Sequence, residues 1–145
     1  MAILEQVYLQ EPARMFAVRW ESEKVLGTNY VVKGPDSIWA EAVDLWASNL
    51  EDDLSYLSDE KRRQIETHPV YGRLLELAAG CTQWIAQEAF QSRRDLRAVG
   101  SIDEDGECEV SLRLVGEPRT FFLIRASIAR ATGTVFDEEG IVLEF

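Results

Sequence analysis

The sequence has few of the residues on which metal sites and nucleophilic catalysis most often depend. Its 145 residues include one histidine, His68, and two cysteines, Cys81 and Cys108. A single histidine excludes histidine pairs and histidine-rich metal sites, and neither cysteine has a partner at metal-ligand spacing. Both cysteines lie in apolar-patterned segments, which predicts buried free thiols in a reducing compartment. We therefore expect no metal and no cofactor.

Targeting signals, membrane spans and phosphate loops are also missing. The start of the chain lacks the basic residues and the apolar run of a signal peptide. No uninterrupted stretch of about 18 apolar residues is present to cross a bilayer. The glycines at Gly100 and Gly133 lack the spacing of either nucleotide-binding fingerprint. These absences predict a soluble cytoplasmic protein that does not bind membranes.

Positive charge is scarce as well. Fifteen basic residues against 26 acidic ones give a formal net charge of −11. Such a surface repels nucleic-acid phosphates and anionic lipid headgroups, so we exclude direct nucleic-acid binding. The same field favours a basic protein as partner.

The hydrophobic content is that of a globular protein. Hydrophobic residues make up 46% of the chain and charged residues 28%, which fits one α+β domain over residues 1–145. Apolar residues alternate with polar ones in 3–9 and 14–21, on either side of a Gln-Glu-Pro break. This pattern predicts an N-terminal β-ribbon, which 28–33 could extend.

The middle of the chain has helical periodicity. We expect helices over about 36–56, from Ser58 to about Thr67, and from about Pro69 to Arg94. Ser58 has the residue type of an N-cap, and His68 directly before Pro69 is expected to have a capping or loop role.

After Asp95 the apolar period changes from 3.6 to 2, as in a half-buried strand. Segment 108–114 is the clearest case, and segments 120–128, 134–136 and 141–145 follow it. Gly106 and Gly140 mark hairpin turns. The pattern predicts a C-terminal antiparallel meander of five strands with one face packed on two to three helices.

Two motifs could suggest chemistry but lack essential parts. Asp103, Asp105 and Gly106 resemble part of a calcium loop, yet leucine stands where the bidentate glutamate would be required. A nucleophilic pair would have to use His68, and both cysteines lie in regular apolar patterns. We assign no catalytic residue, and we favour a non-catalytic role over an enzyme.

Two functional hypotheses remain. The first is an acidic interaction protein of the inhibitor, immunity or adaptor type, which binds a basic partner. Its acidic loops would lie together at one end of the sheet, and its contact residues would be Asp103, Glu104, Asp105, Glu107, Asp137, Glu138 and Glu139. The alternative is a domain, possibly an enzyme, that binds a small molecule in a pocket between helices and sheet. That pocket would be lined by Tyr30, Trp39, Trp46 and Trp84. A homo-oligomer that pairs the edge strand 141–145 with its own copy is a further possibility.

Overall fold

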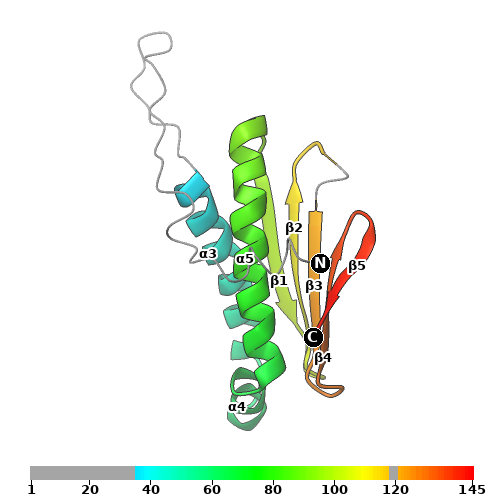
Figure 1. Cartoon of the computed structure of the whole chain (residues 1–145). Helices are drawn as coiled ribbons and strands as arrows, with labels where there is room; N and C mark the ends of the chain where they lie inside the picture. The colour runs from blue at the N-terminus through cyan, green and yellow to red at the C-terminus, as the bar shows by residue number, and fades with distance from the viewer. Residues whose placement is uncertain (1–34, 118–120) are drawn as a thin grey trace.

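The structure, a computed structural model, describes residues 35–117 and 121–145. Three helices precede five strands in this part of the chain (Figure 1). The helices are α3 (Pro35–Ser55), α4 (Asp59–Glu66) and α5 (Pro69–Ser92), and the strands are β1 (Leu96–Ile102), β2 (Glu107–Leu114), β3 (Phe121–Ser127), β4 (Thr132–Asp137) and β5 (Gly140–Glu144). The expected N-terminal ribbon lies outside the described residues, as does Tyr30.

The helix boundaries follow from capping chemistry. The Ser58 hydroxyl accepts a hydrogen bond from the Lys61 N–H at the start of α4, which confirms the predicted N-cap. At the start of α5, His68 Nδ1 accepts from the Val70 N–H at 3.1 Å. The single histidine therefore caps a helix, as expected. Arg93 ends α5 in the left-handed region with φ 56°.

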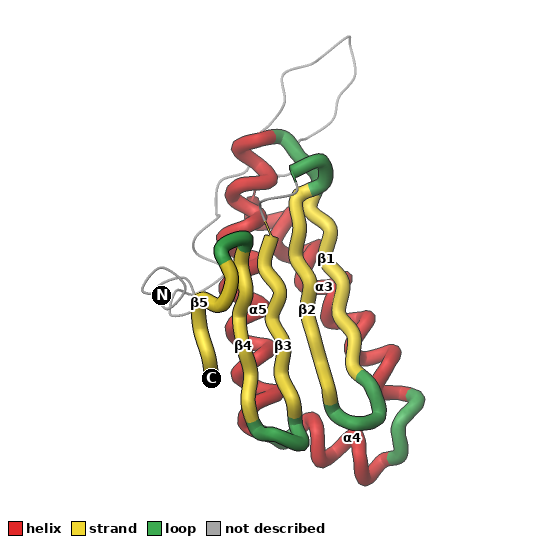
Figure 2. The backbone as a smooth tube through the Cα atoms, turned by 90° about the vertical axis from the view of Figure 1, so that its right-hand side faces the viewer, coloured by secondary structure: helices red, strands yellow, loops and turns green. Residues whose placement is uncertain are grey.

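The strands form one antiparallel sheet in the order β1-β2-β3-β4-β5, so each strand pairs with the next one along the chain. Figure 2 shows the sheet in front and the helices behind it. This arrangement confirms the predicted α+β class and the meander packed on helices. The face of the sheet turned away from the helices has no described helix over it.

The core lies between α3, α5 and one face of the sheet. Alternate residues of each strand point into it, as the period of 2 predicts. On α5, a broad face is buried because the helix packs against both α3 and the sheet. The most deeply buried large side chains of this core include Leu50, Leu54, Leu74, Leu77, Ile85, Val110, Leu112, Ile124 and Val135.

Helix α3 packs closely along β1, the first edge strand. A Cβ atom at Gly100 would overlap the carbonyl oxygen of Trp46, so glycine permits this approach. Two α3 side chains then accept hydrogen bonds from β1: Asn49 Oδ1 from the Gly100 N–H at 3.1 Å, and Asp53 Oδ2 from the Ile102 N–H at 2.9 Å. Both N–H groups point away from β2, and α3 thus binds two of the outward donors of this edge strand.

Candidate protein-binding surface

The β1–β2 hairpin is an acidic loop whose backbone is held by its own side chain. Asp103 Oδ1 accepts hydrogen bonds from the N–H groups of Asp105 and Glu107, both at 3.0 Å. Gly106 has φ 82°, a conformation that glycine adopts without strain. Its carbonyl accepts from the Ile128 N–H in the neighbouring turn. The loop carboxylates are therefore presented from a fixed backbone.

The C-terminal end of α3 adds acid to this hairpin. Asp53 binds the backbone of Ile102, the residue before Asp103, and Asp52 is its exposed neighbour. We use the term acidic end for these carboxylates together: Asp52, Asp53, Asp103, Glu104, Asp105 and Glu107. The contribution of α3 was not predicted from the sequence. The approach of this helix end to β1 depends on tertiary packing, which joins residues 49 positions apart.

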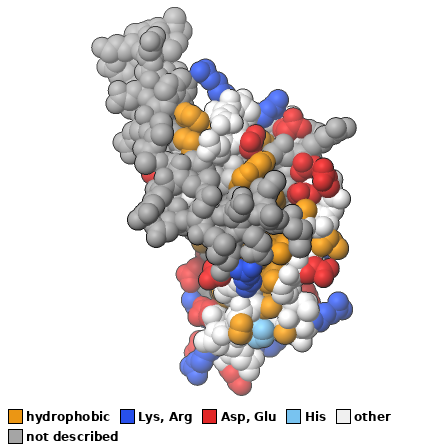
Figure 3. All heavy atoms as spheres, viewed as in Figure 1, with side chains coloured by type: hydrophobic (Ala, Val, Ile, Leu, Met, Phe, Trp, Pro, Cys, Tyr) orange, Lys and Arg blue, Asp and Glu red, His pale blue; other side chains and the backbone are white. Residues whose placement is uncertain are grey.

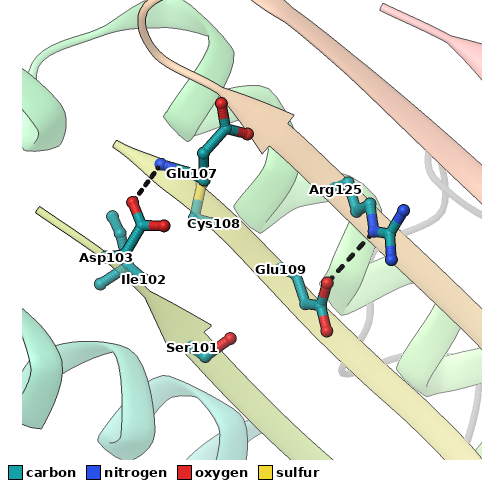
Figure 4. Close-up of a pocket in the computed structure, with 7 residues that line it drawn as sticks. All are labelled: Ser101, Ile102, Asp103, Glu107, Cys108, Glu109 and Arg125. Carbon is teal, nitrogen blue, oxygen red and sulfur yellow. Dashed lines mark hydrogen bonds and ion pairs between the residues drawn. The ribbon is translucent and has the colours of Figure 1, made fainter. Parts of the chain in front are cut away.

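One hollow of about 370 Å³ lies beside the acidic end on the open face of the sheet. Figure 4 shows Asp103, Glu107 and Glu109 around it, with Arg125 on the neighbouring strand. Arg125 Nε is bound to Glu109 Oε2 at 3.1 Å in a cross-strand ion pair. The remaining carboxylates give this hollow a net negative lining.

A second hollow of about 310 Å³ lies on the other side of the same hairpin, against α4. Its lining includes Glu104, Asp105 and Lys61. The Lys61 ammonium donates to the Glu104 carbonyl at 2.9 Å and so ties α4 to the hairpin. The loop carboxylates thus stand between two concave surfaces, a shape suited to the long side chains of lysine and arginine.

The second predicted acidic loop lies elsewhere. The β4–β5 hairpin also has an internal hydrogen bond, from the Glu139 N–H to Asp137 Oδ1 at 2.7 Å. Figure 2 shows this hairpin at the opposite end of the sheet from the β1–β2 hairpin. The expectation that both loops share one end was therefore wrong. In a meander, successive turns alternate between the two ends, and the first and fourth turns must fall at opposite ends.

The tryptophans of the alternative hypothesis pack between elements. Trp39 and Trp46, seven residues apart on α3, both face α5: their Nε1 atoms donate to the Ala79 carbonyl at 3.2 Å and to Thr82 Oγ1 at 3.1 Å. Trp84 of α5 meets the Phe122 ring edge-to-face, with centroids 5.6 Å apart. These contacts are those of side chains that hold helices and sheet together. A pocket role for them stays a prediction.

Charge is unevenly spread over the face seen in Figure 3. Several acidic side chains lie at the right of the view, and others lie at its lower left and bottom, with basic side chains between them. A third hollow, of about 320 Å³, lies at the other end of the sheet beside Arg97 and Arg113. Carboxylates line the hollows at the β1–β2 hairpin, whereas two arginines and Glu117 line the hollow at the far end of the same two strands.

Comparisons with known proteins add no family or activity to this geometry. The chain matches no family model, no characterised protein and no solved structure. Among the helices of residues 35–117 and 121–145, none has the length and apolar character that crossing a bilayer requires. In the same residues, no group of three or more His, Cys, Asp or Glu side chains is placed to hold a metal ion.

Both cysteines are free and buried, as the sequence predicted. Burial raises the pKa of the Cys108 thiol to about 12, with a smaller effect from the neighbouring Glu107 carboxylate. Burial also raises the pKa of Cys81, and it raises that of the Tyr71 phenol to about 12. Near neutral pH both thiols therefore stay protonated, which makes them poor nucleophiles.

These shifts predict a loss of stability in alkali. The folded state keeps protons that the unfolded chain releases above its ordinary thiol pKa, so stability is full below about pH 8 and falls as pH rises. We expect the free energy of unfolding to fall by about 1–2 kcal/mol per pH unit between about pH 9 and about pH 10. Urea unfolding followed by circular dichroism would measure it. The Cys81→Ala/Cys108→Ala variant should show a shallower slope, and an unchanged slope would contradict the assignment to the thiols.

Proposed function

We propose that the protein is a non-catalytic interaction domain of the cytoplasm that binds a basic protein partner through the acidic end. Inhibitors, immunity-type proteins and adaptors are the classes that act in this way. The observation that carries the proposal is the β1–β2 hairpin. Its backbone is held by Asp103 and Lys61, and its carboxylates stand between two hollows.

The charge of the whole chain supports this proposal. A net charge of −11 attracts a basic protein over a distance of about a Debye length and speeds association. The fixed hairpin reduces the ordering cost of binding, because its carboxylates need no rearrangement. The same field repels nucleic acid, which we do not expect as a partner.

Two variants of equal net charge test which end of the sheet binds the basic partner. Glu104→Gln/Asp105→Asn neutralises the tip of the β1–β2 hairpin, and Glu138→Gln/Glu139→Gln neutralises the tip of the β4–β5 hairpin. Neither variant alters Asp103 or Asp137, whose side chains hold the turns. The partner would be isolated by co-purification from the native lysate at low salt and identified by mass spectrometry.

We expect the partner to be retained by wild type at low salt and released near 1 M, where the Debye length is about 3 Å. The Glu104→Gln/Asp105→Asn variant should bind it about 10-fold more slowly, as measured by stopped-flow association, since rim charges act mainly on the on-rate. The Glu138→Gln/Glu139→Gln variant should associate at nearly the wild-type rate. Equal slowing in both variants would show that overall charge, and not the acidic end, controls binding.

A further inference from the structure

The open face of the sheet carries an apolar row that no described helix covers. Strand register places five residues in one line across all the strands. Val99 is 46% exposed and Ile141 is 59% exposed, although both are large apolar side chains. We call this line the central row, and it consists of Val99, Ser111, Leu123, Phe136 and Ile141.

Charged rows of different character flank the central row. On the side of the β2–β3 connection, Arg97 lies opposite Arg113, and the Arg113 guanidinium lies 6.0 Å from the centre of the Phe121 ring. On the side of the β1–β2 hairpin, Glu109 lies opposite Arg125 and is bound to it. Like charges directly opposite one another destabilise a sheet, so the arginine pair would be stabilised by a facing carboxylate.

We propose that the open face binds a second copy of this chain, face to face, about a two-fold axis that runs along the central row. Aligned sheets pack about 10 Å apart, a separation that apolar side chains fill. The axis places the central row on its own copy. The rotation reverses the direction of the strands in the second copy. The flanking row that contains Arg113 in one copy therefore faces the flanking row that contains Glu109 in the other copy.

This geometry gives complementary contacts on β2 and β3. Arg113 faces Glu109 of the second copy, and by symmetry Glu109 faces Arg113 of that copy. Phe121 faces Arg125 of the second copy, which brings a cation to an aromatic ring. Within one chain, the Arg125 guanidinium already lies 5.7 Å from the centre of the Phe136 ring. The other symmetric arrangement, with the axis parallel to the strands, would place Arg113 on its own copy and is disfavoured by repulsion.

The size of the face sets the expected strength. Strand spacing and rise give a footprint of about 500 Å² per copy, which is at the low end for specific interfaces. The corner at β4 and β5 adds no favourable pair, because Glu138, Glu139 and Glu144 are all acidic. We therefore expect a weak dimer centred on β1–β3.

Sedimentation equilibrium of the full chain at about 0.15 M salt, where the Debye length is about 8 Å, tests the proposal. At that salt concentration the repulsion between two copies of charge −11 is largely screened. We expect the average mass to rise from one chain toward two between about 1 µM and about 1 mM protein. A constant single-chain mass over this range would overturn the proposal.

Charge reversal tests the orientation. Position 113 of one copy faces position 109 of the other. A dimer of the Arg113→Glu variant therefore places two glutamates opposite each other at both such contacts, and a dimer of the Glu109→Arg variant places two arginines there. Each variant alone should dimerise at least 10-fold more weakly than wild type. An equal mixture of the two should recover, because the introduced glutamate of one chain then faces the introduced arginine of the other and the two unaltered residues also pair. Far-UV circular dichroism would establish that both variants are folded.

Ile141→Glu provides a second variant at a site exposed enough to leave folding intact, and it should also weaken the dimer. A mixture that stays monomeric while each variant is folded would overturn the two-fold axis along the central row. Full dimerisation of all three variants would place the contact elsewhere, for example at the free edge of β5. Arg113 and Ile141 line neither hollow of the acidic end, so the results for Arg113→Glu and Ile141→Glu distinguish this proposal from the proposed function.

Discussion

Replacement of Gly100 with alanine is expected to destabilise the protein by about 2–3 kcal/mol, although alanine adds only one methyl group. The added Cβ would overlap the Trp46 carbonyl oxygen and lie 3.0 Å from Leu50 Cγ. The first of these atoms belongs to the backbone of α3 and cannot rotate away. The helix would have to move from β1, and the hydrogen bond from the Gly100 N–H to Asn49 would lengthen.

Gly72→Ala is the matched control. Gly72 lies in α5, has no atom within 4 Å of an added Cβ and has no positive φ. Alanine there should stabilise the protein by about 0.5–1 kcal/mol, because glycine loses more backbone entropy in a helix. Urea unfolding of the two variants would measure both values. A Gly100→Ala variant as stable as wild type would contradict the close contact of α3 with β1.

Trp46→Ala is expected to cost about 3–5 kcal/mol, the usual range for loss of a buried aromatic side chain. Trp46 is 3% exposed. Its loss would leave a cavity between α3 and α5. Thr82 Oγ1 would also lose the hydrogen bond that it accepts from the Trp46 indole N–H. Thermal unfolding followed by circular dichroism would measure the change without dependence on tryptophan fluorescence.

Trp39→Ala serves as comparison on the same helix face. Trp39 is only half-buried, so the loss should be about 1–2 kcal/mol. The comparison also bears on the pocket hypothesis. A ligand-binding wall can be truncated at little cost to folding, whereas a core side chain cannot. A small loss for Trp46→Ala would therefore contradict its place in the core and favour a pocket.

Much of the fold could be predicted because its signals are local. The hydroxyl of Ser58 and the position of His68 before Pro69 identify two helix starts within a few residues. The change of apolar period after Asp95 identifies the strands, since alternate residues of a strand face one side. The short turns with glycine at Gly106 and Gly140 then require an antiparallel meander.

The candidate site was predictable only in part, because it depends on contacts between distant residues. The hairpin carboxylates were correctly placed in a turn, but Asp53 joins them through a contact with Ile102 that is 49 residues away in sequence. The loop at Asp137 was predicted at the wrong end of the sheet, although the alternation of turns in a meander already places it opposite the β1–β2 hairpin. The role of Gly100 could not be predicted, since it follows from where α3 docks.

The hydrogen bonds from β1 to Asn49 and Asp53 have a consequence for assembly. An edge strand with two of its outward N–H groups already bound to a helix has fewer groups left to pair with an incoming strand. Of the two outer strands of the described sheet, β5 is therefore the more open to a further strand, because α3 packs along β1. Two copies joined there would present their β1 edges outward, both closed by α3. The helix that lies along β1 thus opposes the growth of such a pair into a continuous fibre built edge to edge.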